Sequence, residues 1–374
     1  MPDSKYRFIY NCDANNTFIY DEPPMKPADV NKYVDELIGW GLTTLLMSVH
    51  CGQDMNYDGV HGELVGSHAS PEQEARILDP EVAKSGTTER AIQNYRALIA
   101  DGYDPLGLTL DRAKEKGLET FITFRPNEVH CVEDPDSIVL SRFWKDHPQY
   151  HIGTPGDPLP PLYTEIMGTA SPIVHTWIPG GLDFAEPEVR EMTLAQIREL
   201  CERYDLDGLD MDFQRFPVYF RFGQEDAGIP IMTEFMRQVR ATTNEVGEKR
   251  GRPMLLSVRT MSKMYQNNGI GIDPVAWAKE GLFDFVIVSH YLRNEYELPI
   301  AEHLAAYPDD MPFYASIEFE RDTDRYREIA RKLWSDGVDG LQMFNFPAAR
   351  EGDTQPPFEV LPELADREKM LGGK

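Results

Sequence analysis

Short apolar runs alternate with longer amphipathic stretches along most of the chain. A glycine just past a helix adopts the left-handed conformation that ends it, and a short apolar run is typical of a strand buried on both faces. Five runs follow such a glycine: Leu45–Val49, Thr120–Phe124, Met211–Phe213, Phe285–Val288 and Leu341–Phe344. Three further apolar runs, Arg7–Asn11, Met254–Val258 and Phe313–Ile317, bring the number of predicted strands to eight.

Apolar residues at helical spacing occupy the segments between these runs. The predicted helices are Pro27–Trp40, Leu106–Lys116, Pro187–Tyr204, Ile231–Glu248, Pro274–Glu280, Ile300–Tyr307 and Thr323–Ser335. Eight parallel strands separated by helices, in a chain of 374 residues, predict a (β/α)8 barrel, the TIM-barrel fold of the α/β class. The competing architecture is a doubly wound open sheet, but no GxGxxG turn follows the first strand to support it.

Two long segments, 51–104 and 126–185, show no regular period of apolar residues. They follow the second and third predicted strands, which places both at the end of a barrel where active sites are built. Long loops without regular structure are usually functional. We therefore interpret them as active-site loop insertions within a single barrel domain that spans residues 1–374.

The charge balance excludes several classes of partner. The chain has 37 Lys and Arg against 63 Asp and Glu, which gives a net charge of −26. Such a protein repels nucleic acid and anionic membrane surfaces, so neither is an expected partner. No run of 18 apolar residues occurs, and the strand-like Tyr6–Tyr10 begins too early to leave room for a signal sequence. This favours a soluble protein, either cytoplasmic or exported and already freed of its signal.

The candidate catalytic residues are polar side chains at strand ends, because barrel enzymes carry their chemistry there. Asp212 ends the fourth strand, and Glu318 and Glu320 end the seventh, so these carboxylates would face each other across the barrel mouth. Glycoside hydrolysis needs such a pair, one carboxyl group to protonate the leaving oxygen and one to attack or to activate water. We predict Asp212 as the general acid and Glu318 or Glu320 as the nucleophile or base. The sixth strand adds His290 and Tyr291 as further catalytic candidates.

Three arginines, Arg125, Arg215 and Arg259, follow or end three successive strands. Guanidinium groups bind carboxylate and sulfate bidentately, so this concentration suggests an anionic sugar such as a uronate or a sulfated residue. The alternative is that each arginine neutralises a carboxylate inside the barrel. The other predicted substrate-binding residues are polar or aromatic groups at strand ends and in the third loop: His50, Asn11, Asp13, Asn127, Gln214, Asn345 and Trp177.

A metal site is a weaker hypothesis. His50-Cys51 and His130-Cys131 follow neighbouring strands close to Asp13 and together offer nitrogen, sulfur and oxygen donors. Adjacent residues on an extended segment point in opposite directions, however, and cysteine is more often buried as a small apolar residue. The sequence therefore predicts no metal and no other cofactor.

One stretch of the chain carries a family resemblance. Leu182–Arg190 and Glu202–Pro217 resemble the bacterial glycosyl-hydrolase-like barrel proteins, and Phe143–Tyr150 is similar to a segment found upstream in that group. The likeness is specific over residues 143–217 and extends to the rest of the chain only as architecture. It implies a (β/α)8 barrel in a carbohydrate context, in a group of which many members have no established substrate.

Asp207–Gln214 also resembles the fourth-strand signature of chitinases, which ends in a catalytic glutamate. Here the last position is Gln214, and an amide cannot act as a general acid. Three functions stay open: a glycoside hydrolase that uses Asp212, a dehydratase or lyase acting on a uronate-containing oligosaccharide, and a sugar-binding barrel without catalysis. The elimination would use His290, Tyr291 and His50 beside the arginines. We predict the hydrolase, with an oligosaccharide as its partner.

Overall fold

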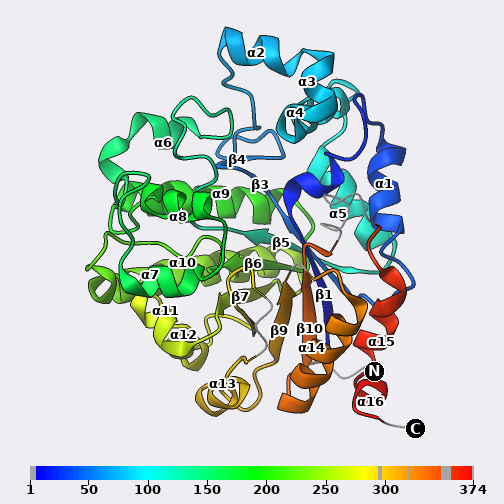
Figure 1. The fold of residues 1–374 in the computed structure, drawn as a ribbon, viewed down its shortest axis with the longest axis vertical. Helices are drawn as coiled ribbons and strands as arrows, with labels where there is room; N and C mark the ends of the chain where they lie inside the picture. Colours follow the sequence, from blue (N-terminus) through cyan, green and yellow to red (C-terminus); the bar gives the residue numbers. More distant parts are fainter. Residues whose placement is uncertain (1–5, 294–296, 319, 347–354, 373–374) are drawn as a thin grey trace.

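The computed structural model describes residues 6–293, 297–318, 320–346 and 355–372. Eight parallel strands form a closed barrel in the order β1-β10-β9-β8-β7-β6-β5-β2 (Figure 1). They are β1 (Phe8–Cys12), β2 (Thr44–Ser48), β5 (Glu119–Phe124), β6 (Gly208–Asp212), β7 (Leu255–Met261), β8 (Phe285–Ser289), β9 (Phe313–Glu318) and β10 (Gly340–Phe344). The predicted (β/α)8 barrel is confirmed, and each of the eight predicted strands overlaps one of these.

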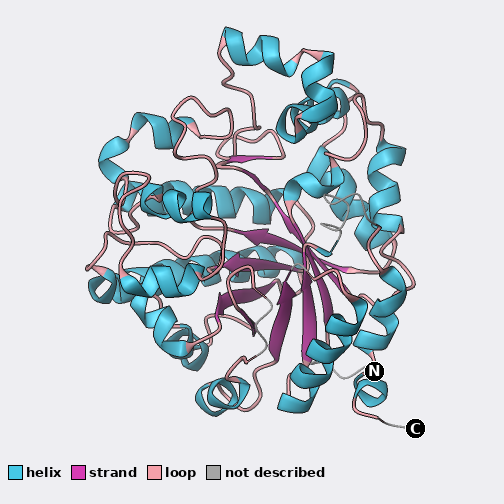
Figure 2. Cartoon of the chain, viewed as in Figure 1, coloured by secondary structure: helices cyan, strands magenta, loops and turns pink. Residues whose placement is uncertain are grey.

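Helices surround the strands (Figure 2). Those between successive barrel strands include α1 (Pro27–Asp35), α5 (Pro105–Glu115), α9 (Pro187–Arg203), α10 (Glu225–Arg250), α11 (Met264–Gly269), α12 (Pro274–Glu280), α13 (Ile300–Ala306) and α14 (Thr323–Asp336). Four of them begin with proline at the first helical position, where its fixed backbone angle suits a helix and its missing N–H costs nothing. α14 ends at Gly337, whose φ of 101° is left-handed. α15 (Leu361–Ala365) and α16 (Arg367–Met370) follow the barrel.

The two long segments after β2 and β5 contain regular structure, so the expectation of structureless loops was wrong. After β2 come β3 (His50–Cys51), β4 (Asp54–Met55), α2 (Pro71–Ile77), α3 (Pro80–Ser85) and α4 (Thr87–Ala100), and after β5 come α6 (Arg142–Asp146), α7 (Pro161–Met167) and α8 (Pro172–Trp177). Most of these elements have seven residues or fewer, too few to show a period. α4 is longer, and its buried Ile92, Tyr95 and Leu98 follow helical spacing that the sequence already contained.

The barrel interior changes from apolar to polar along its axis. Its lower layer is a cluster of buried side chains: Ile9, Leu46, Phe121, Phe285, Ile287 and Tyr314. Further towards the carboxyl ends of the strands, Asp210 lies in register with Thr123 and Ser257, and Asp212 lies in register with Arg259. The polar layers therefore gather at the end of the barrel from which the long segments leave.

β1 closes the barrel because it pairs with both β2 and β10. At its end the backbone N–H of Asp13 donates to the Asn345 side chain over 2.9 Å, which joins the first strand to the last at the barrel mouth. Across the described ranges, none of the helices combines the length and the apolar character needed to cross a bilayer.

Candidate active site

A buried triad of charged side chains occupies the carboxyl end of the barrel. Arg259, on β7, donates to Asp212 on β6 over 3.1 Å and to Glu318 on β9 over 2.5 Å. All three residues are 0 to 1% exposed. One guanidinium group thus joins the two carboxylates that the sequence predicted to face each other, while the face of Phe344 lies 4.3 Å from the guanidinium carbon.

The two carboxylates of the triad have different surroundings. Asp212 also accepts hydrogen bonds from the backbone N–H groups of Gln214 and Arg215, at 3.1 and 3.2 Å, and lies 3.9 Å from the Arg125 guanidinium. Burial raises the pKa of Glu318, and Arg259 together with a hydrogen bond from Ser316 opposes only part of this effect. Two backbone N–H groups and two guanidinium groups therefore surround the carboxylate of Asp212.

Asp210 lies one layer deeper in the barrel. Its carboxyl group accepts hydrogen bonds from Thr123 Oγ1 at 2.7 Å and from Ser257 Oγ at 2.6 Å. Burial, and then the negative charge of Asp212, raise its pKa to about 6, although both hydroxyl groups oppose the rise. Residues on the two neighbouring strands thus donate a hydrogen bond to each carboxyl oxygen of Asp210, which indicates a structural role for this residue.

A second charged cluster surrounds Arg125, just after β5. Its guanidinium group pairs with Asp13 and, over 3.2 Å, with Glu128. Burial alone would raise the pKa of Asp13, but Arg125, Arg215 and Asn345 lower it to about 2. Burial opposes ionisation of Glu128 as well, yet His130 and Arg125 hold its pKa well below the usual range.

The arginines of the mouth pair with carboxylates of the same chain. Arg125 and Arg259 do so directly, and Arg215 lies 3.8 Å from Asp13 and 3.0 Å from the Nε2 atom of His130. Three guanidinium groups here accompany four carboxyl groups: Asp13, Glu128, Asp212 and Glu318. The region therefore has no excess of positive charge. The arginines neutralise carboxylates inside the barrel, which was the alternative to binding an anionic sugar.

Gln214, at the position of the chitinase glutamate, links two strands. Its Nε2 atom donates to Ser289 Oγ at 2.6 Å and to the backbone carbonyl of His290 at 2.5 Å. The ring of His290 in turn shares a 2.8 Å hydrogen bond with Ser262. Tyr291 is 1% exposed, and burial raises the pKa of its hydroxyl well above the usual value. These residues surround the triad on the β8 side.

Several other predicted substrate-binding residues hold loops together. Asn345 accepts hydrogen bonds from Asp13 and Asn16, and Asn127 ties together three backbone groups from Leu182 and Val218 at 2.7 to 2.9 Å. These contacts satisfy the amide groups within the protein, so their first role is to position loops around the mouth.

Two predicted residues offer groups that are less committed. Asn11 is fully buried on β1, and neither polar atom of its side chain has a hydrogen-bond partner among the described residues. Trp177 is half-buried, and its ring lies 5.2 Å from that of His130 and 6.3 Å from that of Phe216. Asn11 thus places an amide group inside the barrel, and the ring of Trp177 lies beside that of His130.

Glu320 lies two residues beyond β9. Its carboxylate accepts hydrogen bonds from the backbone N–H groups of Arg321 and Asp322 at 2.8 and 3.1 Å, just before α14 begins. Of the two glutamates considered after the seventh strand, Glu318 is the one that contacts Arg259. Glu320 instead stabilises the turn into the helix.

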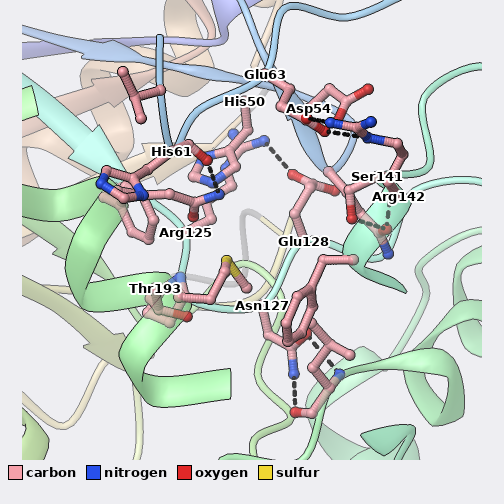
Figure 3. Close-up of a pocket in the computed structure, with 18 residues that line it drawn as sticks. His50, Asp54, His61, Glu63, Arg125, Asn127, Glu128, Ser141, Arg142 and Thr193 are labelled. Carbon is pink, nitrogen blue, oxygen red and sulfur yellow. Dashed lines mark hydrogen bonds and ion pairs between the residues drawn. The ribbon is translucent and has the colours of Figure 1, made fainter. Parts of the chain in front are cut away.

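A cavity of about 290 Å³ opens beside the charged clusters (Figure 3). The β3–β4 hairpin, the segment after β5 and the first half of α9 enclose it, and His50, Arg125 and Asn127 are among its lining residues. His50 packs edge-on against Phe124 at 4.7 Å, and burial lowers its pKa to about 3, so the ring is neutral. Arg125 both lines the cavity and contacts Asp212, and it therefore connects the two regions.

Three carboxylates that line the cavity escaped the sequence analysis: Asp54, Glu63 and Glu128. Glu128 lies three residues after Arg125, a spacing that could have indicated their ion pair. Asp54 also lines the cavity and is only 3% exposed. Nothing in the local sequence marks Asp54, because a long-range arrangement of loops buries it.

The hypothetical mixed-ligand metal site does not form. In the part of the chain that the structure describes, no group of three or more His, Cys, Asp and Glu side chains is arranged to hold a metal ion. Cys51 instead shares a 3.2 Å hydrogen bond with the buried Tyr95, and burial raises the pKa of its thiol.

Comparisons with known proteins give structural matches only. No protein-family model matches the chain, and no curated protein sequence does. Among solved structures, similarity extends to a noncanonic maltogenic alpha-amylase, AmyB, from Thermotoga neapolitana (TM-score 0.51, 14% identity, 97% of this chain and 76% of that one). An endo-beta-1,4-mannanase from Thermotoga petrophila also aligns (TM-score 0.53, 13% identity, 99% and 78%). The chain shares the barrel fold of glycoside hydrolases.

A third similar structure is the chitinase ChiW from Paenibacillus sp. str. FPU-7. It aligns with a TM-score of 0.53 and 10% identity, over 98% of this chain and 43% of the longer ChiW chain. At such identities the likeness establishes the architecture and leaves the chemistry to be argued from the side chains.

Proposed function

We propose that the protein is a glycoside hydrolase-like enzyme that cleaves a neutral oligosaccharide or polysaccharide with Asp212 and Glu318. The observation that carries the proposal is the shared contact of these two carboxylates with Arg259 at the carboxyl end of the barrel. Glycoside hydrolysis by this route uses two carboxyl groups that flank the scissile bond. The barrel end that holds them is where enzymes of this fold carry their active sites.

The surroundings of the two carboxylates suggest their roles. Burial raises the pKa of Glu318, so this side chain suits the group that protonates the leaving oxygen. Asp212 accepts hydrogen bonds from two backbone N–H groups and from Arg259, an arrangement that suits the nucleophile or base. This assignment exchanges the roles expected from the sequence.

A neutral substrate fits the charge balance better than an anionic one. Arg125 and Arg259 are already paired with carboxylates, so neither is available to neutralise a uronate or a sulfate without losing its partner. Elimination from a uronate needs the same free cations to stabilise an enolate, and it is less favoured for the same reason. The similar structures named for amylase, mannanase and chitinase activity suggest glucans, mannans and chitin fragments as the first substrates to test.

The proposal also requires a movement. The side chains of Asp212 and Glu318 are 0% and 1% exposed, so substrate reaches them only when part of the surrounding network opens. Arg125 contacts Asp212 and borders the cavity, which makes it the first group that substrate would displace. When this network opens, catalysis requires that contacts with the bound substrate replace the ion pairs that are lost.

The test is product analysis with matched variants. The protein is incubated with maltooligosaccharides, mannooligosaccharides and chitooligosaccharides, and with one uronate-containing and one sulfated oligosaccharide as anionic controls, and the products are identified by mass spectrometry. Fragments whose masses sum to substrate plus one water are expected from a neutral oligosaccharide. Asp212→Asn and Glu318→Gln should each lower kcat by roughly a thousandfold or more, whereas the exposed Asp58→Asn should not.

Two outcomes would overturn this assignment. Wild-type rates in both active-site variants would remove Asp212 and Glu318 from the chemistry. A product lighter than substrate by one water would show elimination in place of hydrolysis.

A further inference from the structure

Asp54 is a buried carboxyl group at the edge of a cavity. It lies on β4, is 3% exposed and lines the cavity, and among the described residues its carboxyl group has no hydrogen bond or ion pair. Two other carboxylates that line the cavity are paired: Glu63 with Arg142 and His68, and Glu128 with Arg125 and His130. A buried polar group that lacks a partner is costly, so such a group in a native fold needs an explanation.

The cavity that Asp54 faces has the lining of a small-molecule site (Figure 3). Its volume of about 290 Å³ lies at the lower end of the usual range for ligand pockets. Uncharged polar groups come from Gln53, Ser141, Thr193 and Gln196, while Phe124 and Phe143 provide apolar surface. The charged side chains of the lining besides Asp54 are Glu63, Arg125, Glu128 and Arg142, which pair with one another or with neighbouring residues. Mixed hydrogen-bonding groups and aromatic rings suit a ligand with hydroxyl groups around an apolar ring face.

The protonation state of Asp54 restricts the class of ligand further. Burial first, and then the negative charge of Glu63, raise its pKa to about 8, while Arg142 and Lys145 oppose the rise. At neutral pH the group is mostly a carboxylic acid, which has one O–H donor and an acceptor oxygen. Such a group pairs with a hydroxyl, which both donates and accepts, better than with an ion.

The geometry points to a binding site for one neutral sugar ring, or a polyol of that size, in which Asp54 exchanges hydrogen bonds with ligand hydroxyl groups. An anionic ligand is disfavoured because the carboxylate of Glu63 borders the same cavity and the guanidinium of Arg142 is already paired with it. A metal cation is disfavoured because the described side chains provide no group of three donors. The lining does not include Asp212 or Glu318, and it meets the proposed catalytic pair only through Arg125, which contacts Asp212, so binding at this site is measured separately from hydrolysis.

Direct binding measurements test the inference. Maltose, β-1,4-mannobiose and N,N′-diacetylchitobiose are titrated separately into the full chain at pH 7 and followed by calorimetry and ligand-observed NMR. At least one of them should bind with a dissociation constant in the millimolar range or below. Asp54→Leu removes both hydrogen-bonding functions at similar volume and should weaken binding about tenfold or more, whereas Asp54→Asn keeps a donor and an acceptor and should retain it.

Two further variants control for folding and for location. Gln196→Trp, at a half-buried position of α9 that lines the cavity, should fill the cavity and abolish binding even if Asp54→Leu proves unstable. Asp58→Asn changes an exposed carboxylate three residues beyond β4 and should bind as the wild type does. Binding by Asp212→Asn at wild-type strength would separate this site from the proposed catalytic one, whatever becomes of the hydrolysis.

The inference is overturned if no probe binds the wild-type protein at 20 mM. It is equally overturned if Asp54→Leu and Gln196→Trp both bind a probe as tightly as the wild type, or if Asp212→Asn alone abolishes binding.

Discussion

Two regions of the molecule bury carboxyl groups in opposite ways. At the barrel mouth, Asp212 and Glu318 share Arg259, and Asp13 and Glu128 share Arg125. In the neighbouring cavity, Asp54 is buried without a cation in contact. The pKa of Asp13 falls to about 2, while the pKa of Asp54 rises to about 8.

The difference shows what burial alone does to an acid. Removing a carboxylate from water disfavours its charged form, and only nearby cations and hydrogen-bond donors reverse this effect. At the mouth the strands align arginines with carboxylates in register, as in the pairing of Asp212 with Arg259. In the cavity the wall comes from the β3–β4 hairpin, the segment after β5 and α9, and most of its lining residues are uncharged. One region is therefore suited to chemistry with ions and the other to binding through neutral hydrogen bonds.

The largest expected effect comes from removing the arginine that joins the two carboxylates at the barrel mouth. Arg259→Met keeps the volume of the side chain but leaves Asp212 and Glu318 buried without their shared cation. We expect a loss of about 3–5 kcal/mol in the free energy of unfolding at pH 7, measured by denaturant titration. Arg237→Met, which removes an exposed pair with Glu280, should change stability little. Equal losses of unfolding free energy in Arg259→Met and Arg237→Met would contradict the difference between the buried and the exposed ion pairs.

In the cavity, replacing the buried carboxyl group should increase stability, and the increase should grow with pH. Because the folded-state pKa of Asp54 is about 8 and an unfolded aspartate titrates near 3.9, the folded protein retains a proton that the unfolded chain has lost. Stability from this group is therefore lost as pH rises from about 4 to about 8. Asp54→Asn does not titrate and should exceed the wild type in stability by on the order of 2–4 kcal/mol at pH 8.

At pH 4 the advantage of Asp54→Asn should nearly vanish, and Asp58→Asn should show no comparable trend between pH 4 and pH 8. The charged groups that act on Asp54 are Glu63, Arg142 and Lys145. A difference between Asp54→Asn and the wild type that stays constant over this range would show that Asp54 is ionised throughout.

A smaller effect should follow from the layer below the triad. Ser257→Ala removes one of the two hydroxyl groups that donate to the buried Asp210. We expect a loss of about 1–2 kcal/mol in unfolding free energy at pH 7, because a buried acceptor loses a partner. Ser335→Ala, on the exposed surface of α14, is the matched control and should lie near the wild type. A loss no larger than that of the control would mean that Thr123 alone satisfies Asp210.

The smallest effect is expected at Glu320. Because its carboxylate serves backbone N–H groups before α14, Glu320→Gln keeps an acceptor there and should change both kcat and stability little, by less than about 0.5 kcal/mol each. Activity on the substrate identified for the wild type, assayed beside Glu318→Gln, checks this. A loss as large as that of Glu318→Gln would return Glu320 to the catalytic pair.

Periodicity predicted the barrel because each strand and each long helix carries its own local signal. Leu45–Val49 is shifted by one residue from the observed β2, Thr120–Phe124 begins one residue after the start of β5, and Pro274–Glu280 coincides with α12. α10 begins at Glu225, six residues before the predicted start, and Pro230 lies inside it. The shorter α6 and α8, with five and six residues, gave no usable period.

The site was predictable only where strand register determines the contacts. Asp212, Arg259 and Glu318 follow from residues at the ends of β6, β7 and β9, and the structure brings them together. Whether the arginines serve substrate or protein could not be decided from the sequence, since both uses satisfy a charge. Asp54 was missed because its burial depends on the long segments after β2 and β5, whose packing has no local signature.

The contact between Asp13 and Asn345 has a consequence for biosynthesis. Its two residues are separated by 332 positions in the chain, so the ribosome makes the first long before the second. At about 5–20 residues per second, roughly 20–70 s pass between them. During that time Asp13 has no Asn345 to fix it, and β1 has only one of its two neighbours. The cluster around Arg125 is therefore complete only when β10 has emerged, so a nascent chain lacks the finished mouth until its last strand is in place.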